Sequence, residues 1–172
     1  VEFNEGLEEI GQLAFNNCQK ISNIKIPASV SIISDSSFNE CVSLKSITVD
    51  EKNNYFCSDV AGALFNKEKT ILIQYPACST ANIYQIPDGI TKINNSAFYG
   101  ASNLKSITIP ESVEEIGNCA FWGCVDIVDI VIPENIHKIG IYAFNCCWWN
   151  KKGSITFKRT ESFEYDSDAL IN

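Results

Sequence analysis

The sequence contains no methionine, a single histidine and no apolar run that approaches ~20 residues, the length of a transmembrane helix. It is also poor in basic residues, with 13 lysines and arginines against 21 acidic residues and a net charge of −8. We therefore expect no membrane insertion, and the negative charge disfavours nucleic acid and anionic membranes as partners. Because methionine is absent and Val1 starts in mid-pattern, we expect a mature chain or an excised segment, whose missing signal peptide says nothing about its compartment.

Apolar residues are abundant by contrast and make up 45% of the 172 residues. This composition is globular, and the length is sufficient for one domain with a continuous core. Eight cysteines could indicate a disulfide scaffold, which is typical of short secreted domains that lack a large core. The positions of the cysteines within a repeat favour a different interpretation, given below.

A 23-residue period runs through the chain. Phenylalanine, proline and isoleucine each recur at this interval, which indicates a solenoid in which every repeat forms one coil. The recurring residues are Phe15 and Phe38; Phe98, Phe121 and Phe144; Pro87, Pro110 and Pro133; Ile10 and Ile33; and Ile93, Ile116 and Ile139.

Each ordinary coil begins with a predicted strand. In the coil from Leu104 to Cys124, strand alternation points Ile107 inward and Ser106 and Thr108 outward. Pro110 ends the strand because it has no N–H to donate to a neighbouring strand.

The rest of the coil predicts a second side and a closing corner. Ile116 turns inward again, Gly117 is expected to permit a tight corner, and Phe121 closes the coil through a short helical turn. One coil cannot bury its apolar side alone, whereas coils stacked ~4.8 Å apart bury it continuously. The predicted fold is a β-rich, right-handed stack of coils with a parallel sheet, short helical turns and one β-hairpin insertion.

One coil is longer than the others. Its two proline-equivalent positions, Asp50 and Pro87, are 37 residues apart, so the coil carries 14 extra residues. We expect it to lack the Phe-x-x-Cys element that closes the other coils. Two apolar segments around a polar turn predict a protruding β-hairpin, with strands near Ala63–Phe65 and Thr70–Gln74 and a turn at Asn66–Lys69.

The coil sequence LKSITIPESVEEIGNCAFWGC resembles the BspA-like leucine-rich repeat, and so do IKIPASVSIISDSSFNEC and IVIPENIHKIGIYAFNCC. The longer coil, with GALFNKEKTILIQYP, is similar to a recurrent variant in that family. The resemblance covers roughly residues 1 to 150 and implies a leucine-rich-repeat solenoid. It also implies a non-catalytic, adhesin-like module at the cell surface or secreted, because this fold itself carries no chemistry.

The chain departs from the family pattern at a few positions. Asn4 and Asp50 replace the proline, Ala101 replaces the cysteine, and Ser34 and Asn94 replace the glycine. We nevertheless predict a single domain. It consists of ordinary coils at 1–49 and 84–150, the variant coil at about 50–86, and a degenerate terminal coil at 151–172, in which Ser154–Phe157 forms one more strand displaced by two residues.

Half of the cysteines occupy one repeat position, which predicts a ladder of buried, reduced thiols. Equivalent Cβ atoms of stacked coils lie ~4.8 Å apart, whereas a disulfide requires ~3.8 Å, and a linear ladder does not converge on a zinc ion. The alternative of a disulfide between Cys57 and Cys78, both in the variant coil, stays open, and Cys119 and Cys146 lie off the ladder. The ladder residues are Cys18, Cys41, Cys124 and Cys147.

No residue pattern predicts catalysis, a cofactor or a metal site. His137 is equivalent to Glu114 and Thr91 in the preceding coils, which are surface residue types, and the spacing supplies no partner for a catalytic dyad. Recurring carboxylate pairs such as Glu8-Glu9 are most simply a solvated face. Trp122 is either an exposed binding residue or, as we favour, packed against the next corner. The sequon Asn94-Asn95-Ser96 matters only in a secreted eukaryotic protein.

The outward positions of the first strands form a row of mostly small, polar side chains, which suits an extended contact better than a deep pocket. We predict that this row binds an extracellular host or matrix protein or a glycan, with the hairpin as a flanking wall. The alternative function is a structural spacer that projects another domain. The row consists of Asn23, Lys25, Ser46, Thr48, Gln85, Ser106, Thr108, Asp129, Val131, Ser154 and Thr156.

Overall fold

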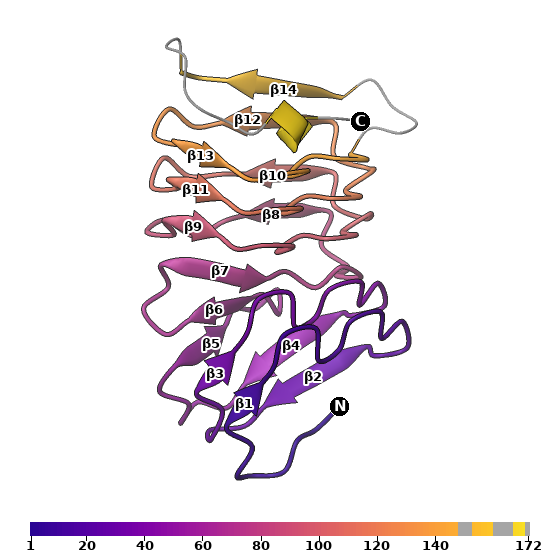
Figure 1. Cartoon of the computed structure of the whole chain (residues 1–172), viewed down its shortest axis with the longest axis vertical. Coiled ribbons are helices and arrows are strands. Elements are labelled where there is room, and N and C mark those ends of the chain that lie inside the picture. Colours follow the sequence, from indigo (N-terminus) through magenta and orange to yellow (C-terminus); the bar gives the residue numbers. More distant parts are fainter. Residues whose placement is uncertain (148–152, 160–166, 171–172) are drawn as a thin grey trace.

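The computed structural model of the chain describes residues 1–147, 153–159 and 167–170, and in it the chain winds into a β-solenoid (Figure 1). Successive coils stack along one axis, and the apolar side chains fill the interior between two sides of each coil. The predicted coil stack is thereby confirmed.

The first side of the solenoid carries one strand of almost every coil, because an alternating apolar and polar segment recurs there. Paired strands are offset by one repeat, as in Asn23↔Ser46. In the last pair, Asp129↔Ser154, the offset is one repeat plus two positions, which confirms the predicted displacement of the final strand. The strands are β2 (Asn23–Ile26), β4 (Ser46–Val49), β8 (Ile83–Gln85), β10 (Ser106–Thr108), β12 (Asp129–Ile132) and β14 (Ser154–Phe157).

The second side carries shorter strands and, in the variant coil, three strands in place of one. The register again follows the repeat, with Glu115 opposite Lys92 and Lys138. The strands are β1 (Glu9–Ile10), β3 (Ile32–Ile33), β5 (Phe56–Ser58), β6 (Leu64–Asn66), β7 (Ile71–Gln74), β9 (Lys92–Ile93), β11 (Glu115–Ile116) and β13 (Lys138–Ile139).

The predicted parallel pairing is present along the first side, but as three pairs, β2–β4, β8–β10 and β12–β14, and not as one continuous sheet. The insertion in the variant coil separates β4 from β8. Between β10 and β12 the structure has one backbone hydrogen bond, from Val128 N–H to the Lys105 carbonyl at 3.3 Å. The longest sheet lies on the second side, with six strands in the order β13-β11-β9-β7-β6-β5.

The predicted helical turns at the corners are also wrong, since the only described helix is a 3-10 turn, η1 (Ser167–Leu170). The residues two before and two after the recurring aromatic have positive φ angles. In two successive coils these are Ser96 (57°) and Gly100 (70°), and Cys119 (53°) and Gly123 (72°). Left-handed residues cannot continue a right-handed helix, so each corner is a series of tight turns.

Gly117 is required for a different reason from the one expected. Its φ lies outside the left-handed region, but an added Cβ would lie 2.6 Å from the backbone nitrogen of Asn95. The Asn95 side chain accepts a hydrogen bond from Asn118 N–H (2.8 Å), and Asn118 in turn accepts one from Ile141 N–H (3.0 Å). This asparagine ladder holds the corners together and occupies the space above each glycine.

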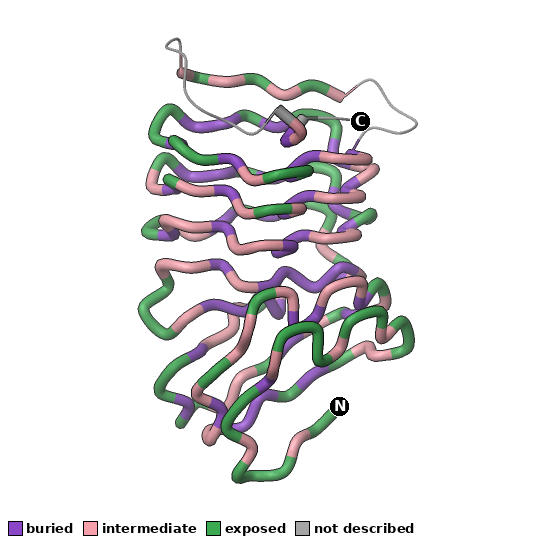
Figure 2. The backbone as a smooth tube through the Cα atoms, in the orientation of Figure 1, coloured by how far each residue is buried: buried purple, intermediate pink, exposed green. Residues whose placement is uncertain are grey.

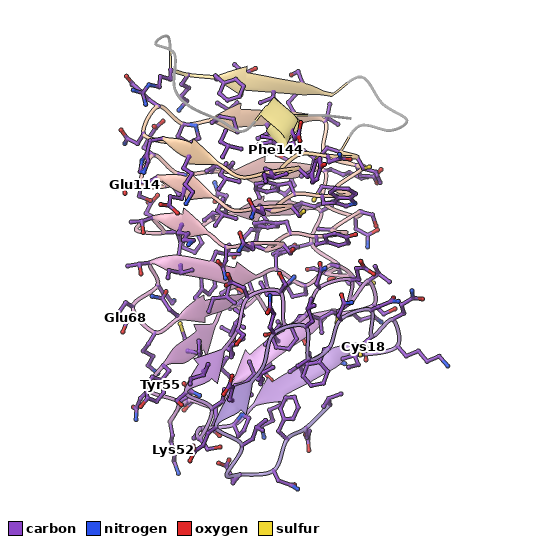
Figure 3. The ribbon with its side chains drawn as sticks, viewed as in Figure 1. Cys18, Lys52, Tyr55, Glu68, Glu114 and Phe144 are labelled. Carbon is purple, nitrogen blue, oxygen red and sulfur yellow. The ribbon has the colours of Figure 1, made fainter. Side chains whose placement is uncertain are left out.

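The recurring aromatic residues stack along the interior, as predicted. Phe144, labelled in Figure 3, is one of them and is fully buried. Phe15 is the exception: it is half-buried, because no described coil precedes its own, and the ring of Phe3 packs against it. The ring centroids are 5.0 Å apart for Tyr75–Phe98, 4.9 Å for Phe98–Phe121 and 5.2 Å for Phe121–Phe144.

The variant coil retains the closing element that it was expected to lack. Tyr75 and Cys78 stand one full repeat before Phe98 and Ala101 and thus fill the phenylalanine and cysteine positions. Tyr75 stacks on Phe98, and its backbone N–H donates to the Ala97 carbonyl at 2.7 Å.

The predicted hairpin is present as β6 and β7, but it does not protrude. Both strands belong to the six-stranded sheet, which β5 extends further, while the exposed tip includes Glu68 (Figure 3). Leu64 and Phe65 are both fully buried and point to opposite faces of β6. Leu64 belongs to the core of the N-terminal coils and Phe65 to the core of the C-terminal coils, so β6 is a layer between two cores.

The corner of the variant coil is two residues shorter than in its neighbour. Leu72, which is paired with Ile93, lies three residues before Tyr75, whereas Ile93 lies five residues before Phe98. The corners on either side therefore meet directly: the two carboxylate oxygens of Asp35 accept hydrogen bonds from Asn94 (2.8 Å) and Asn95 (2.9 Å).

The described C-terminal segments cover the last coil. β14 pairs with β12, and η1 takes the place of a further corner. Tyr142 N–H donates to the Asp168 carbonyl (3.2 Å), Phe144 N–H donates to the Ala169 carbonyl (3.1 Å), and the Ala169 side chain is buried. Residues 148–152 and 160–166, which include Trp148, Trp149 and much of the predicted terminal coil, lie outside the described residues.

Candidate binding face

Strand alternation places the predicted row on the surface. In β2 and β12 exposed and buried residues alternate (Figure 2). The buried positions between the row residues are isoleucines, which belong to the core. Every predicted row residue is exposed except Ser46, which is half-buried. We call this set of eleven side chains the outer row.

Neighbouring members of the outer row interact along the solenoid axis. Ser46 Oγ donates to Asn23 Oδ1 at 2.8 Å, and Ser154 Oγ donates to Asp129 Oδ1 at 2.5 Å. The structure thus joins row residues by side-chain hydrogen bonds in two of the three parallel ladders, β2–β4 and β12–β14.

The variant coil interrupts the outer row between β4 and β8. A loop that includes Asp59–Gly62 lies beside β4, where Ile47 N–H donates to the Gly62 carbonyl at 3.0 Å. A Cβ at Gly62 would lie 2.8 Å from Ser46 Cα, so only glycine allows this approach. The hairpin tip lies on the other side of the coil, which makes the expectation of a hairpin wall beside the row wrong.

Sequence reasoning missed one residue of the row. Ile83 pairs with Ser106 and occupies the same outward repeat position, yet 65% of it is exposed. Val60, in the loop of the variant coil, is fully exposed. The repeat alone identifies Ile83, since it lies one full period before Ser106.

A shallow hollow of about 330 Å³ adjoins the row at β8 and β10. Gln85 and Thr108 line it from the outer row, and Asp88 adds a carboxylate. A smaller hollow of about 70 Å³ occupies the equivalent place between Lys25 and Asp50. Both hollows are lined by polar side chains together with proline, Pro87 and Pro110 in the larger one and Pro27 in the smaller one.

The second side carries mixed charges. Glu115 lies 3.7 Å from both Lys92 and Lys138, a partly exposed network that contributes little stability. His137 and Glu114 (Figure 3) are exposed on the same side, and His137 N–H donates to the Glu114 carbonyl. Within the described part of the chain, no three histidine, cysteine or acidic residues are grouped to hold a metal ion.

All eight cysteines are free thiols, so Cys57 and Cys78, whose pairing the sequence left open, are not bridged. In the ladder, Cys41, Cys124 and Cys147 each donate an S–H to the phenylalanine carbonyl of the preceding coil, at 3.1, 3.1 and 3.0 Å. Burial raises the pKa of Cys41 to about 11 and that of Cys147 to about 12.

Cys18 departs from the ladder prediction because it lies at the edge of the first described coil and is half-buried (Figure 3). We expect thiol labelling of the native protein to modify Cys18 at least ~10-fold faster than Cys41, Cys124 or Cys147, because the thiolate is the reactive form and burial suppresses it. Peptide mapping by mass spectrometry before and after denaturation measures this. Equal rates at Cys18 and Cys124, or a Cys124–Cys147 bridge, would contradict the ladder.

Two further predicted candidates have structural partners. Trp122 is half-buried between Tyr99, stacked at 6.2 Å, and Tyr142, edge-on at 5.7 Å, which supports packing against the next corner. The side chain of Asn94 in the sequon is hydrogen-bonded to Asp35. No described helix is long and apolar enough to cross a membrane.

The sequence matches the family model of the BspA type leucine rich repeat region, in six copies over residues 1–74 and 74–167. No curated protein matches the chain.

Two solved structures are similar over almost the whole chain. A leucine-rich repeat protein from Eubacterium ventriosum is 32% identical with a TM-score of 0.86, and the match covers 93% of this chain and 42% of that one. The pneumococcal vaccine antigen PcpA is 27% identical with a TM-score of 0.79, covering 92% of this chain and 46% of PcpA. The chain thus spans less than half the length of either relative.

Proposed function

Because the chain belongs to the BspA-type leucine-rich repeat family, we propose that it is a non-catalytic binding module of a cell-surface or secreted protein. It recognises an extracellular host or matrix protein or a glycan through the outer row. The observation that carries this proposal is the exposure of side chains at the same two positions of successive strands, beside a polar hollow. The similarity to a vaccine antigen supports an exposed location.

A structural spacer is the second candidate. The hydrogen bonds Ser46–Asn23 and Ser154–Asp129 favour it, because they satisfy row side chains within the protein. On this hypothesis the coils project another part of a longer protein and the row binds nothing.

Bulky charges in the row should separate the two functions. We expect Ser106→Arg with Thr108→Arg to abolish binding to any partner found on a panel of immobilised matrix proteins, serum proteins and glycans. Both side chains are exposed on β10, so circular dichroism should show an unchanged fold. The matched control is Glu115→Arg with Lys138→Arg on the second side, which should leave binding intact. Loss in the control alone would assign binding to the other side, and binding unaffected by either variant would favour the spacer.

A further inference from the structure

Strand β8 is hydrogen-bonded along one edge only. The Asn82 carbonyl accepts from Lys105 N–H (2.8 Å), and Ile86 N–H donates to the Thr108 carbonyl (3.1 Å). The backbone N–H and C=O groups of the even-numbered residues in and beside β8 therefore point toward β10. Backbone groups of successive residues point to opposite edges of a strand. The N–H and C=O groups of Ile83 and Gln85 therefore face the variant coil, and no described residue forms a hydrogen bond with them.

The variant coil does not close this edge with a strand. Its loop is bound to β4 instead, through the Ile47–Gly62 hydrogen bond. The loop reaches β8 by a side chain: Asp59 Oδ1 accepts from the N–H groups of Ala61 and Ala63, and Asp59 Oδ2 accepts from the Tyr84 hydroxyl at 2.6 Å. The backbone of β8 takes no part in this contact.

Two exposed apolar side chains stand at the same break. Val60 follows Asp59 in the loop and Ile83 precedes Tyr84 in β8, and the Asp59–Tyr84 hydrogen bond joins these two elements. Val60 is fully exposed and Ile83 is 65% exposed. Unpaired backbone groups beside exposed apolar residues form the template that an added strand needs.

We propose that the open edge of β8 binds an extended polypeptide strand, whose backbone pairs with Ile83 and Gln85 and whose apolar side chains cover Val60 and Ile83. The proposal rests on the binding function proposed above and specifies its partner as a polypeptide in extended conformation. The chain's net charge of −8 favours basic residues at the remaining positions of that strand.

The test uses the full chain and an acetylated, amidated octapeptide of alternating valine and lysine. We expect the peptide to slow hydrogen exchange of the Ile83 and Gln85 amides at least ~10-fold, because each donates to the added strand. Two further peptides carry N-methyl groups on every second amide, one on the odd-numbered and one on the even-numbered residues. We expect one of the two not to bind, because its methyl groups block the edge that pairs with β8. Equal binding of all versions, or protection confined to other strands, overturns the proposal.

The variant Gln85→Pro removes one N–H from the open edge. The bonds between β8 and β10 remain, because they use the backbone of the neighbouring residues, and proline is tolerated on strand edges. We expect it to weaken peptide binding at least ~10-fold, whereas Lys105→Val, which changes an exposed side chain outside the outer row and keeps every backbone N–H, binds as the unchanged protein does. Equal binding by both variants overturns the proposal, and the methylated peptides provide the test should Gln85→Pro fail to fold.

The two proposals fail in different ways. A partner that binds the chain and is lost with Ser106→Arg and Thr108→Arg, but is unaffected by Gln85→Pro, leaves the binding function standing and overturns the strand edge. If the peptide binds at β8 but no partner on the panel binds the chain, the proposed strand-binding edge is supported and the proposed binding through the outer row is contradicted.

Discussion

Replacing Phe121 with alanine is expected to lower the free energy of unfolding by about 3–5 kcal/mol, the usual cost of truncating a buried phenylalanine. Phe121 is fully buried, and its ring lies between those of Phe98 at 4.9 Å and Phe144 at 5.2 Å. Both neighbours are held by their own coils, so the cavity cannot close without moving two turns of the solenoid. Denaturant titration measures the loss.

Phe15→Ala provides a matched control at the same repeat position. Phe15 is half-buried and stacks at 5.8 Å on Phe38. The free energy of unfolding should fall by about half as much as for Phe121→Ala or less, because less apolar area leaves water at this position. A loss below about 1 kcal/mol for Phe121→Ala, the range of surface substitutions, would show that the assigned repeat register is wrong.

Asn53→Ala is expected to destabilise the chain by about 3 kcal/mol or more, since leaving one buried hydrogen-bonding group unpaired costs about 1–3 kcal/mol. Asn53 is fully buried, and its side chain joins the variant coil to the coil before it. Its Nδ2 donates to the carbonyls of Pro27 (2.9 Å) and Val30 (2.8 Å), and its Oδ1 accepts from the N–H groups of Tyr55 and Phe56, both at 2.8 Å.

The neighbouring Asn54→Ala is the control, because Asn54 is exposed. It should change the free energy of unfolding by less than about 0.5 kcal/mol. Thermal or denaturant unfolding of the two variants, followed by circular dichroism, compares them directly. Similar midpoints would mean that water replaces the Asn53 hydrogen bonds and that this residue does not fix the variant coil.

The repeat could be predicted in detail because its period is independent of any single residue. Phe98, Phe121 and Phe144 share one phase with their isoleucines, and a common phase in several coils determines which side chains enter the core. The same phase also contained Tyr75 and Cys78. A search for the letters Phe-x-x-Cys does not find them, because tyrosine stands at the phenylalanine position; the 23-residue spacing does find them.

The corners and the pairing across the insertion could not be predicted in the same way. Leu13 and Tyr142 adopt positive φ angles of 56°, although neither residue type favours that region, so stacking with adjacent coils determines their conformation. Gly117 is required by the close approach of the Asn94–Asn95 backbone and the Asn95 side chain, one coil away, which no local pattern indicates.

The hairpin error has a recognisable cause. Leu64 and Phe65 are adjacent apolar residues, and a strand with apolar residues on both faces is buried on both sides. This signal was present in the sequence and argued against a hairpin that extends into solvent. The residues of the outer row could be predicted only as outward positions, since exposure follows from strand alternation whereas a partner's chemistry does not.

The two-faced strand β6 has a consequence for how the length of such arrays varies. Leu64 packs in the N-terminal core and Phe65 in the C-terminal core, and every ordinary coil contacts only its neighbours. One ordinary coil can therefore be gained or lost on one flank of β6 without altering the side chains that pack on the other flank. The array can lengthen by duplication of coils in either half, while Leu64 and Phe65 of the insertion keep their packing against the two cores.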